Sequence, residues 1–147
     1  MTLFDYKNGD FKETLGSYIE FYVLAFEGKK VVDTVEFNKN VKSDLASIDD
    51  LIPNLKQAIA QGNIQQLASI STESIFRNQC RLNYNILPII KEIQKKTGGI
   101  GIIGAHSGDF LGIIYSENIK MKSALNYNMS VPGYKQYILK TIVNNNQ

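Results

Sequence analysis

The chain has 147 residues, a formal net charge of +2 at pH 7, and a composition that is 44% hydrophobic and 20% charged. This length suffices for one domain with a hydrophobic core, and the composition is ordinary for a globular protein. The lysines are scattered rather than gathered in a basic stripe with interleaved aromatic residues, so we expect no nucleic-acid partner. The single cysteine, Cys80, excludes an internal disulfide and a cysteine-based zinc site, and we expect it to be a buried, inert thiol.

The N-terminal sequence has no signal-peptide architecture, and no apolar run approaches the length of a membrane span. We therefore expect a cytoplasmic chain with no membrane partner. No internal repeat, linker or low-complexity stretch divides the sequence, which predicts a single domain over residues 1–147.

The first third of the chain is predicted to be mostly β-structure. Asn8 and Gly9 lie between two short segments with aromatic residues and are typical of a hairpin turn. Aromatic and β-branched residues predict a strand over residues 18–26. A turn at Gly28 then leads to a second predicted strand over residues 31–37.

A change in the hydrophobic period predicts helices in the middle of the chain. Apolar residues over 48–59 recur with the spacing of one helix face, and Gly62 marks the end of that helix. Asn63 can cap a second helix over residues 64–82. A third helix is predicted over residues 85–97, with a proline tolerated in its first turn.

The last third returns to β-structure. Two isoleucine-rich runs, residues 100–103 and 110–115, flank a turn of small residues, which predicts a hairpin with a glycine-rich tip. A weakly amphipathic helix over residues 117–125 and a strand over residues 136–143 follow. Antiparallel strands segregated from helices in this order predict an α+β two-layer sandwich.

The tip of this hairpin carries the groups with the most chemical potential. His106, the only histidine of the chain, stands beside Ser107. An imidazole, a hydroxyl and the backbone N–H group of Gly108 can together hold a carboxylate or a phosphate. The alternative is that both side chains hydrogen-bond the backbone and only shape the turn. One histidine cannot build a metal site, and we predict no metal ligands.

Two familiar patterns at the hairpin do not fit their usual chemistry. A G-x-G-x-x-G pattern at residues 99–104 follows a helix and leads into a strand, whereas a dinucleotide site follows a strand and opens a helix. His106, Ser107 and Asp109 are the residue types of a hydrolase triad. Neighbours on one turn rarely reach a geometry in which the base faces the nucleophile, so we reject a hydrolase and predict no catalytic residue in this chain.

Residues 98–114 read GGIGIIGAHSGDFLGII, directly after a helical segment that ends in lysines. This stretch resembles the C-terminal glycine-rich motif of the GHMP small-molecule kinases, and within them the L-threonine kinases of cobalamin synthesis and propanediol use. Residues 5–16, 33–38 and 71–79 resemble further segments of that group in the same order. The resemblance covers roughly residues 2–115 and implies a ferredoxin-like two-layer α/β sandwich, with an antiparallel sheet and helices on one face.

The resemblance also implies a substrate-binding or phosphate-binding role for six residues: Gly104, His106, Ser107, Gly108, Asp33 and Asn78. Asp33 lies in an otherwise apolar segment, where an ionised carboxylate needs solvent or a partner. Its alternative is an exposed position on a strand. Asn78 offers amide hydrogen bonding from a helix, and its alternative is a simply solvated side chain.

The ATP-binding segment of that family, of the type Pro-x-x-x-Gly-Leu-x-Ser-Ser in its N-terminal half, has no counterpart here. The resemblance therefore implies the substrate-side C-terminal half of an ATP-dependent kinase for an amino acid or similar alcohol. We expect no activity from the chain alone, since ATP and Mg²⁺ would be supplied through a partner half. The alternative is a non-catalytic small-molecule-binding or oligomerisation module, in which a homo-oligomer or a partner covers exposed apolar surface.

Overall fold

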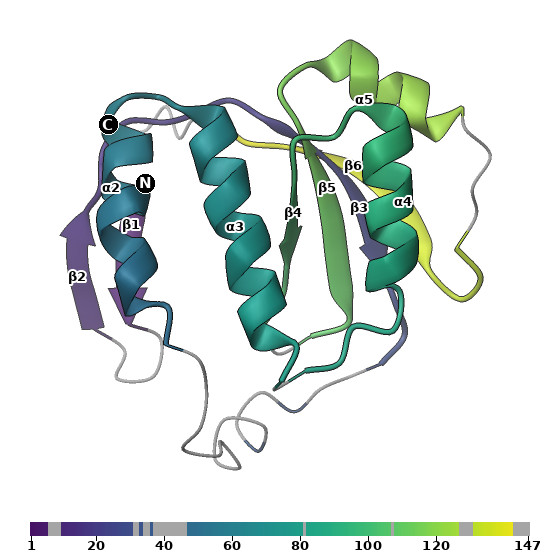
Figure 1. Ribbon diagram of the computed structural model, residues 1–147, viewed down its shortest axis with the longest axis horizontal. Coiled ribbons are helices and arrows are strands. Elements are labelled where there is room, and N and C mark those ends of the chain that lie inside the picture. The colour runs from purple at the N-terminus through teal and green to yellow at the C-terminus, as the bar shows by residue number, and fades with distance from the viewer. Residues whose placement is uncertain are drawn as a thin grey trace.

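The structure, a computed structural model, describes residues 1–5, 10–30, 33, 36, 47–80, 82–106, 108–126 and 131–142. Its centre is a four-stranded antiparallel sheet with the order β4-β5-β3-β6. The strands are β3 (Tyr22–Glu27), β4 (Gly101–Gly104), β5 (Phe110–Tyr115) and β6 (Lys135–Lys140). Helices connect β3 to β4 and β5 to β6, and the two crossovers interleave their strands (Figure 1). This is the ferredoxin-like arrangement, and the α+β prediction is confirmed.

One face of the sheet is covered by α4 (Leu87–Thr97) and α5 (Asn118–Leu125) (Figure 1). Alternate strand residues point to this face, and Phe26 and Ile113 pack there with Ile90 of α4, all fully buried. Burying one side chain of this size stabilises the fold by about 2 kcal/mol. The intervening strand residues, such as Val23 and Ala25, belong to a separate apolar cluster on the opposite face.

Helix α3 (Ile64–Asn78) lies along the outer edge of β4. The Thr72 hydroxyl accepts a hydrogen bond of 2.8 Å from the backbone N–H of Ile102 and donates one of 2.7 Å to the Ala68 carbonyl. A Cβ at Gly101 would stand 2.5 Å from the Ala68 carbonyl oxygen, so only glycine allows this close approach. The helix thus covers an edge that would otherwise present unpaired backbone groups.

The outer part of the molecule contacts α3 and also joins the apolar cluster on the second face of the sheet. It consists of the short 3₁₀ helix η1 (Asp49–Leu51), α2 (Ile52–Ala60) and a hairpin of β1 (Thr2–Asp5) and β2 (Asp10–Thr14). Lys56 of α2 forms an ion pair with Glu13 of β2, with 2.6 Å between the two charged atoms. Figure 1 shows the hairpin beside α2. The antiparallel pairing of β1 with β2 confirms the predicted hairpin, whose turn at Asn8 and Gly9 lies outside the described residues.

The predicted start of α3 and the predicted end of α4 are confirmed, whereas α3 ends at Asn78 and not at the predicted residue 82. The Asn63 side chain accepts a hydrogen bond of 3.0 Å from the N–H of Gln66, which caps α3. Gly98 ends α4 in the left-handed conformation, with φ of 73°. Within the described residues, no helix combines the length and the apolar character that crossing a membrane requires.

The strand predicted over residues 31–37 is wrong at Glu36, which is helical. The backbone N–H of Glu36 donates a hydrogen bond of 3.0 Å to the Asp33 carboxylate. A short acidic side chain that bonds the backbone three residues on favours the start of a helical turn over a strand. Apart from Asp33 and Glu36, this segment lies outside the described residues.

Candidate functional site

The glycine-rich turn, residues 104–109, is held on one side by two buried side chains. The Tyr84 hydroxyl donates to the Ala105 carbonyl at 2.6 Å. The Asn78 amide nitrogen donates to the Tyr84 hydroxyl at 2.7 Å and to the His106 carbonyl at 3.1 Å. Asn78 is only 8% exposed and stands as the one buried polar residue of the described core. Its amide therefore positions the turn through the backbone.

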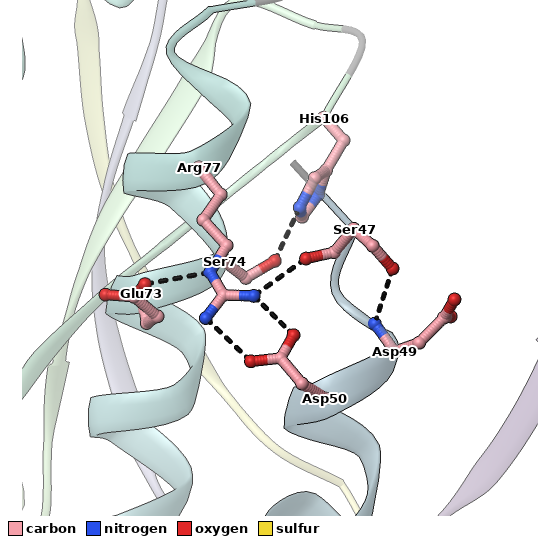
Figure 2. A network of polar contacts seen from close by, with 7 residues as sticks. All are labelled: Ser47, Asp49, Asp50, Glu73, Ser74, Arg77 and His106. Atoms are coloured by element: carbon pink, nitrogen blue, oxygen red, sulfur yellow. Dashed lines mark hydrogen bonds and ion pairs between the residues drawn. The ribbon is translucent and has the colours of Figure 1, made fainter. Parts of the chain in front are cut away.

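The His106 side chain returns from the turn towards α3. Its Nε2 atom lies 2.8 Å from the Ser74 hydroxyl, and which of the two donates depends on the tautomer of the imidazole. Figure 2 shows this contact and the neighbouring polar groups of α3. Both the imidazole and the backbone carbonyl of His106 are thus engaged by residues of one helix.

The other end of the turn is held by Asp109. Its carboxylate accepts hydrogen bonds from the Tyr134 hydroxyl at 2.8 Å and from the backbone N–H of Lys30 at 3.2 Å. Its carbonyl accepts from the N–H of Gly28 at 2.8 Å. Burial of the phenol, together with the adjacent Asp109 carboxylate, raises the pKa of Tyr134 to about 12. The turn is therefore tied to the segment that follows β3.

A polar cavity of about 250 Å³ opens on the Asp109 side of the turn. It combines a cation, a carboxylate, amide side chains and a phenol in a small volume. Its polar lining residues are Lys30, Asn83, Asn85, Asp109 and Tyr134, with Gly108 of the turn and Tyr84. Opposite charges on one small cavity suit a ligand that itself carries both charges.

An apolar cavity of about 420 Å³ lies on the His106 side of the turn. Aliphatic side chains of η1, α2, α3, β4 and β5 form most of its wall. The polar side chains on it are Ser71, Ser74 and His106. The turn therefore separates two cavities of opposite character.

An ion network borders this apolar cavity (Figure 2). The Arg77 guanidinium contacts the Asp50 carboxylate, with 2.9 Å between Nη2 and Oδ2, and the Glu73 carboxylate at 2.8 Å. It also donates to the Ser47 carbonyl at 2.7 Å. The hydrogen bond from Arg77 lowers the pKa of Asp50 below its ordinary value. The network ties η1 to α3 and matches the charge of Arg77 with carboxylates.

The structure brings four of the predicted site residues together. Gly104 and His106 line the apolar cavity, Gly108 lines the polar one, and Asn78 holds the turn from beneath. Asp33 is exposed and bonds the backbone of Glu36, and Ser107 lies outside the described residues.

Packing explains the glycine at position 104 better than ligand contact does. A Cβ there would stand 2.6 Å from the Leu111 side chain, 2.9 Å from that of Ile75 and 3.0 Å from the Phe110 carbonyl oxygen. Neither Gly104 nor Gly108 has a positive φ. The turn therefore needs glycine at 104 to sit against its own strand and α3.

The sequence pattern did not single out the residues that complete the site. Ser74, Tyr84 and Tyr134 reach the turn from segments far away in sequence, and each is an ordinary polar residue in its local context. Only the turn itself carried a local signal. Cys80 is exposed, so its expected burial is wrong. Among the described residues, no cluster of His, Cys, Asp or Glu side chains could hold a metal ion.

No protein-family model matches the sequence, and no curated protein sequence matches it. The crystal structure of homoserine kinase from Cytophaga hutchinsonii ATCC 33406 is similar to this chain, with a TM-score of 0.55 and 10% sequence identity. The match covers 95% of this chain and 46% of that kinase, so the chain spans about half the length of the kinase. At this identity the likeness shows that this chain shares its fold with about half of that kinase.

Proposed function

We propose that this chain is the substrate-side domain of an ATP-dependent small-molecule kinase, and that it binds a hydroxyl-bearing amino acid such as L-threonine. A separate ATP-binding half would bring ATP and Mg²⁺ to it. Phosphoryl transfer depends mainly on positioning and electrostatic stabilisation, so a domain that only holds the acceptor contributes to the reaction by positioning it.

The polar cavity is the observation that carries this proposal. Lys30 can pair with the carboxylate of an amino acid, and the Asp109 carboxylate can accept from its ammonium group. The cavity volume of about 250 Å³ suits a small amino acid rather than a nucleotide. Its wall includes Gly108 of the glycine-rich turn, the segment that resembles the GHMP motif.

The second candidate is a non-catalytic module that keeps the fold and the cavity as a small-molecule sensor. The firm anchoring of Asp109 by Tyr134 and by backbone groups favours neither candidate. Whether binding of the acceptor leads to phosphorylation in the presence of an ATP-binding half separates the two.

Isothermal titration of the purified chain with L-threonine, L-homoserine and ATP·Mg²⁺ tests the proposal. We expect saturable binding of a hydroxyl amino acid and none of ATP·Mg²⁺. Asp109→Asn should weaken amino-acid binding at least tenfold, because a charge-assisted hydrogen bond contributes about 1.5–3 kcal/mol. Glu92→Gln, on the exposed side of α4, is the matched control and should bind as the wild type does. Nucleotide binding by this chain alone, or equal binding by both variants, would contradict the proposal.

A further inference from the structure

The apolar cavity plays no part in the proposed amino-acid site, although it is the larger of the two. We propose that it binds a neutral amphiphile: an aliphatic chain of medium length that ends in one hydroxyl group. The argument rests on the distribution of polarity along its wall, on the charges at its rim, and on its size.

Polarity changes along the wall that α3 contributes. Leu67, Ile70, Ser71, Ser74 and Ile75 lie on the cavity and follow the spacing of a single helix face. At 1.5 Å per residue, Leu67 and Ser74 are about 10 Å apart along the helix axis. The wall is therefore apolar at the Leu67 end and polar at the Ser74 end, over a length that suits a medium aliphatic chain.

The polar end offers one well-placed hydrogen-bonding pair. The Ser74 hydroxyl and the His106 Nε2 atom are 2.8 Å apart, and both residues line the cavity. A hydroxyl group can donate and accept at once, so a ligand hydroxyl can join this pair whichever tautomer the imidazole adopts. A ligand with no polar group would remove water from Ser74 and His106 without offering either of them a hydrogen bond.

Charge at the rim argues against an ionised head group. Arg77 is the cation nearest to Ser74 on α3, and it already contacts the carboxylates of Asp50 and Glu73. Its positive charge is therefore matched, and a carboxylate head group would meet two carboxylates near the rim (Figure 2). An ammonium head group has no acceptor atom, so it cannot both donate to and accept from the Ser74–His106 pair as a hydroxyl can. A neutral hydroxyl avoids both costs.

The volume of about 420 Å³ falls in the range of sites for small organic ligands. Aliphatic side chains of Leu51, Ile52, Leu55 and Ile103 would surround the chain of the ligand. Binding of an apolar ligand in a cavity of this kind is favourable, because the ligand replaces poorly bound water.

Calorimetric titration of the full chain with decan-1-ol tests the inference, with decanoate and decyltrimethylammonium as charged comparisons. We expect saturable binding of decan-1-ol at one site and at least tenfold weaker binding of both ions. Ser74→Ala should reduce the affinity for decan-1-ol about fivefold, the effect of one lost hydrogen bond of about 1 kcal/mol. Ile70→Trp should abolish binding by filling the cavity. Ile89→Trp is the matched control, since Ile89 is 40% exposed on α4 and does not line the cavity.

Unsaturable uptake of decan-1-ol would overturn the inference, as would equal affinity for the three head groups. Wild-type affinity for decan-1-ol in Ser74→Ala would overturn the placement of the ligand hydroxyl beside Ser74. This substitution removes only one oxygen atom from the protein. L-threonine binding should be unchanged in the presence of decan-1-ol. The two sites can therefore fail independently of each other.

Discussion

The two cavities beside the glycine-rich turn differ in nearly every property, although one hairpin forms part of both walls. The polar cavity takes its charged and amide side chains from the turn, the segment after β3 and the segment before α4, while Phe110 and Leu111 of β5 complete its wall. The apolar cavity takes its walls from helix faces and strands, whose side chains are mainly aliphatic. One turn can therefore serve two environments, because the segments around it supply most of each wall.

The anchoring of the turn differs between the two sides as well. On the α3 side, Asn78 and Tyr84 bind backbone carbonyl groups and leave the His106 imidazole at the cavity. On the other side, backbone and phenol groups bind the Asp109 carboxylate itself. We expect changes on the α3 side to act mainly through position and changes on the Asp109 side to act mainly through charge.

The largest effect is expected from Gly101→Ala, which separates α3 from β4. The new Cβ would meet the Ala68 carbonyl oxygen at 2.5 Å and the Ala68 Cβ at 2.7 Å, and both belong to a packed helix. Overpacking of this kind should cost about 3 kcal/mol. Gly62→Ala is the control: its Cβ would meet nothing within 4 Å, and its positive φ should cost about 1 kcal/mol. Urea unfolding of both variants measures the difference, and equal losses would contradict the close packing.

A loss of about 2 kcal/mol is expected for Asn78→Ala, because the substitution leaves the buried Tyr84 hydroxyl and the His106 carbonyl without this donor. The turn borders both cavities, so binding of L-threonine and of decan-1-ol should weaken together. Asn54→Ala on the exposed side of α2 should leave stability and both titrations unchanged. If the affinity for only one of the two ligands fell, the turn would not support both cavities.

Tyr134→Phe should affect the polar cavity and leave the apolar cavity unchanged. It removes the hydrogen bond to the Asp109 carboxylate, which should lower the free energy of unfolding by about 1 kcal/mol. Calorimetry should show weaker L-threonine binding and unchanged decan-1-ol binding. Changed affinity for decan-1-ol would show that the cavities are coupled through the turn.

Alkaline titration sharpens the same contrast. The pKa of Tyr134, about 12 in the folded chain, lies above the ordinary value of 10.0. The folded state therefore holds this proton more tightly than the unfolded state does. Its contribution to stability is complete below pH 10 and is lost as the pH rises towards 12. Ultraviolet titration of the tyrosines should show a late phase that shrinks by one phenol in Tyr134→Phe, and an unchanged late phase in that variant would contradict the assignment.

The smallest effect is expected at the rim of the apolar cavity. The pKa of Asp50 is held below its ordinary value of 3.8 by Arg77, so the pair contributes stability above that pH and loses it as the pH falls through the lowered pKa. Asp50→Asn should unfold slightly more easily than the wild type at pH 7 and equally at strongly acidic pH. Thermal unfolding across this range measures it, and high salt should shrink the difference because the pair is exposed.

Much of the fold could be predicted from local patterns. The Asn63 cap, the Gly98 helix end and the glycine hairpin each follow from neighbouring residues, and the structure confirms them. The predicted strand is wrong at Glu36, because the backbone N–H of Glu36 donates a hydrogen bond to the Asp33 carboxylate. This hydrogen bond is as local as the strand pattern, and it overrides that pattern. The expected burial of Cys80 failed for another reason: Cys80 lies just beyond α3, and whether a residue there is covered depends on the rest of the fold.

The sequence by itself determined where most of the strands, the central helices and the glycine-rich turn lie, because hydrophobic period, caps and turn residues act over a few positions. Only the tertiary structure decided what faces that turn. Ser74, Tyr84 and Tyr134 are between 21 and 32 positions away from their partners in it, and no local pattern marks such pairs. Packing α3 against the edge of β4 brings Ser74 to the turn, whereas Tyr84 and Tyr134 reach it from the segments before α4 and β6.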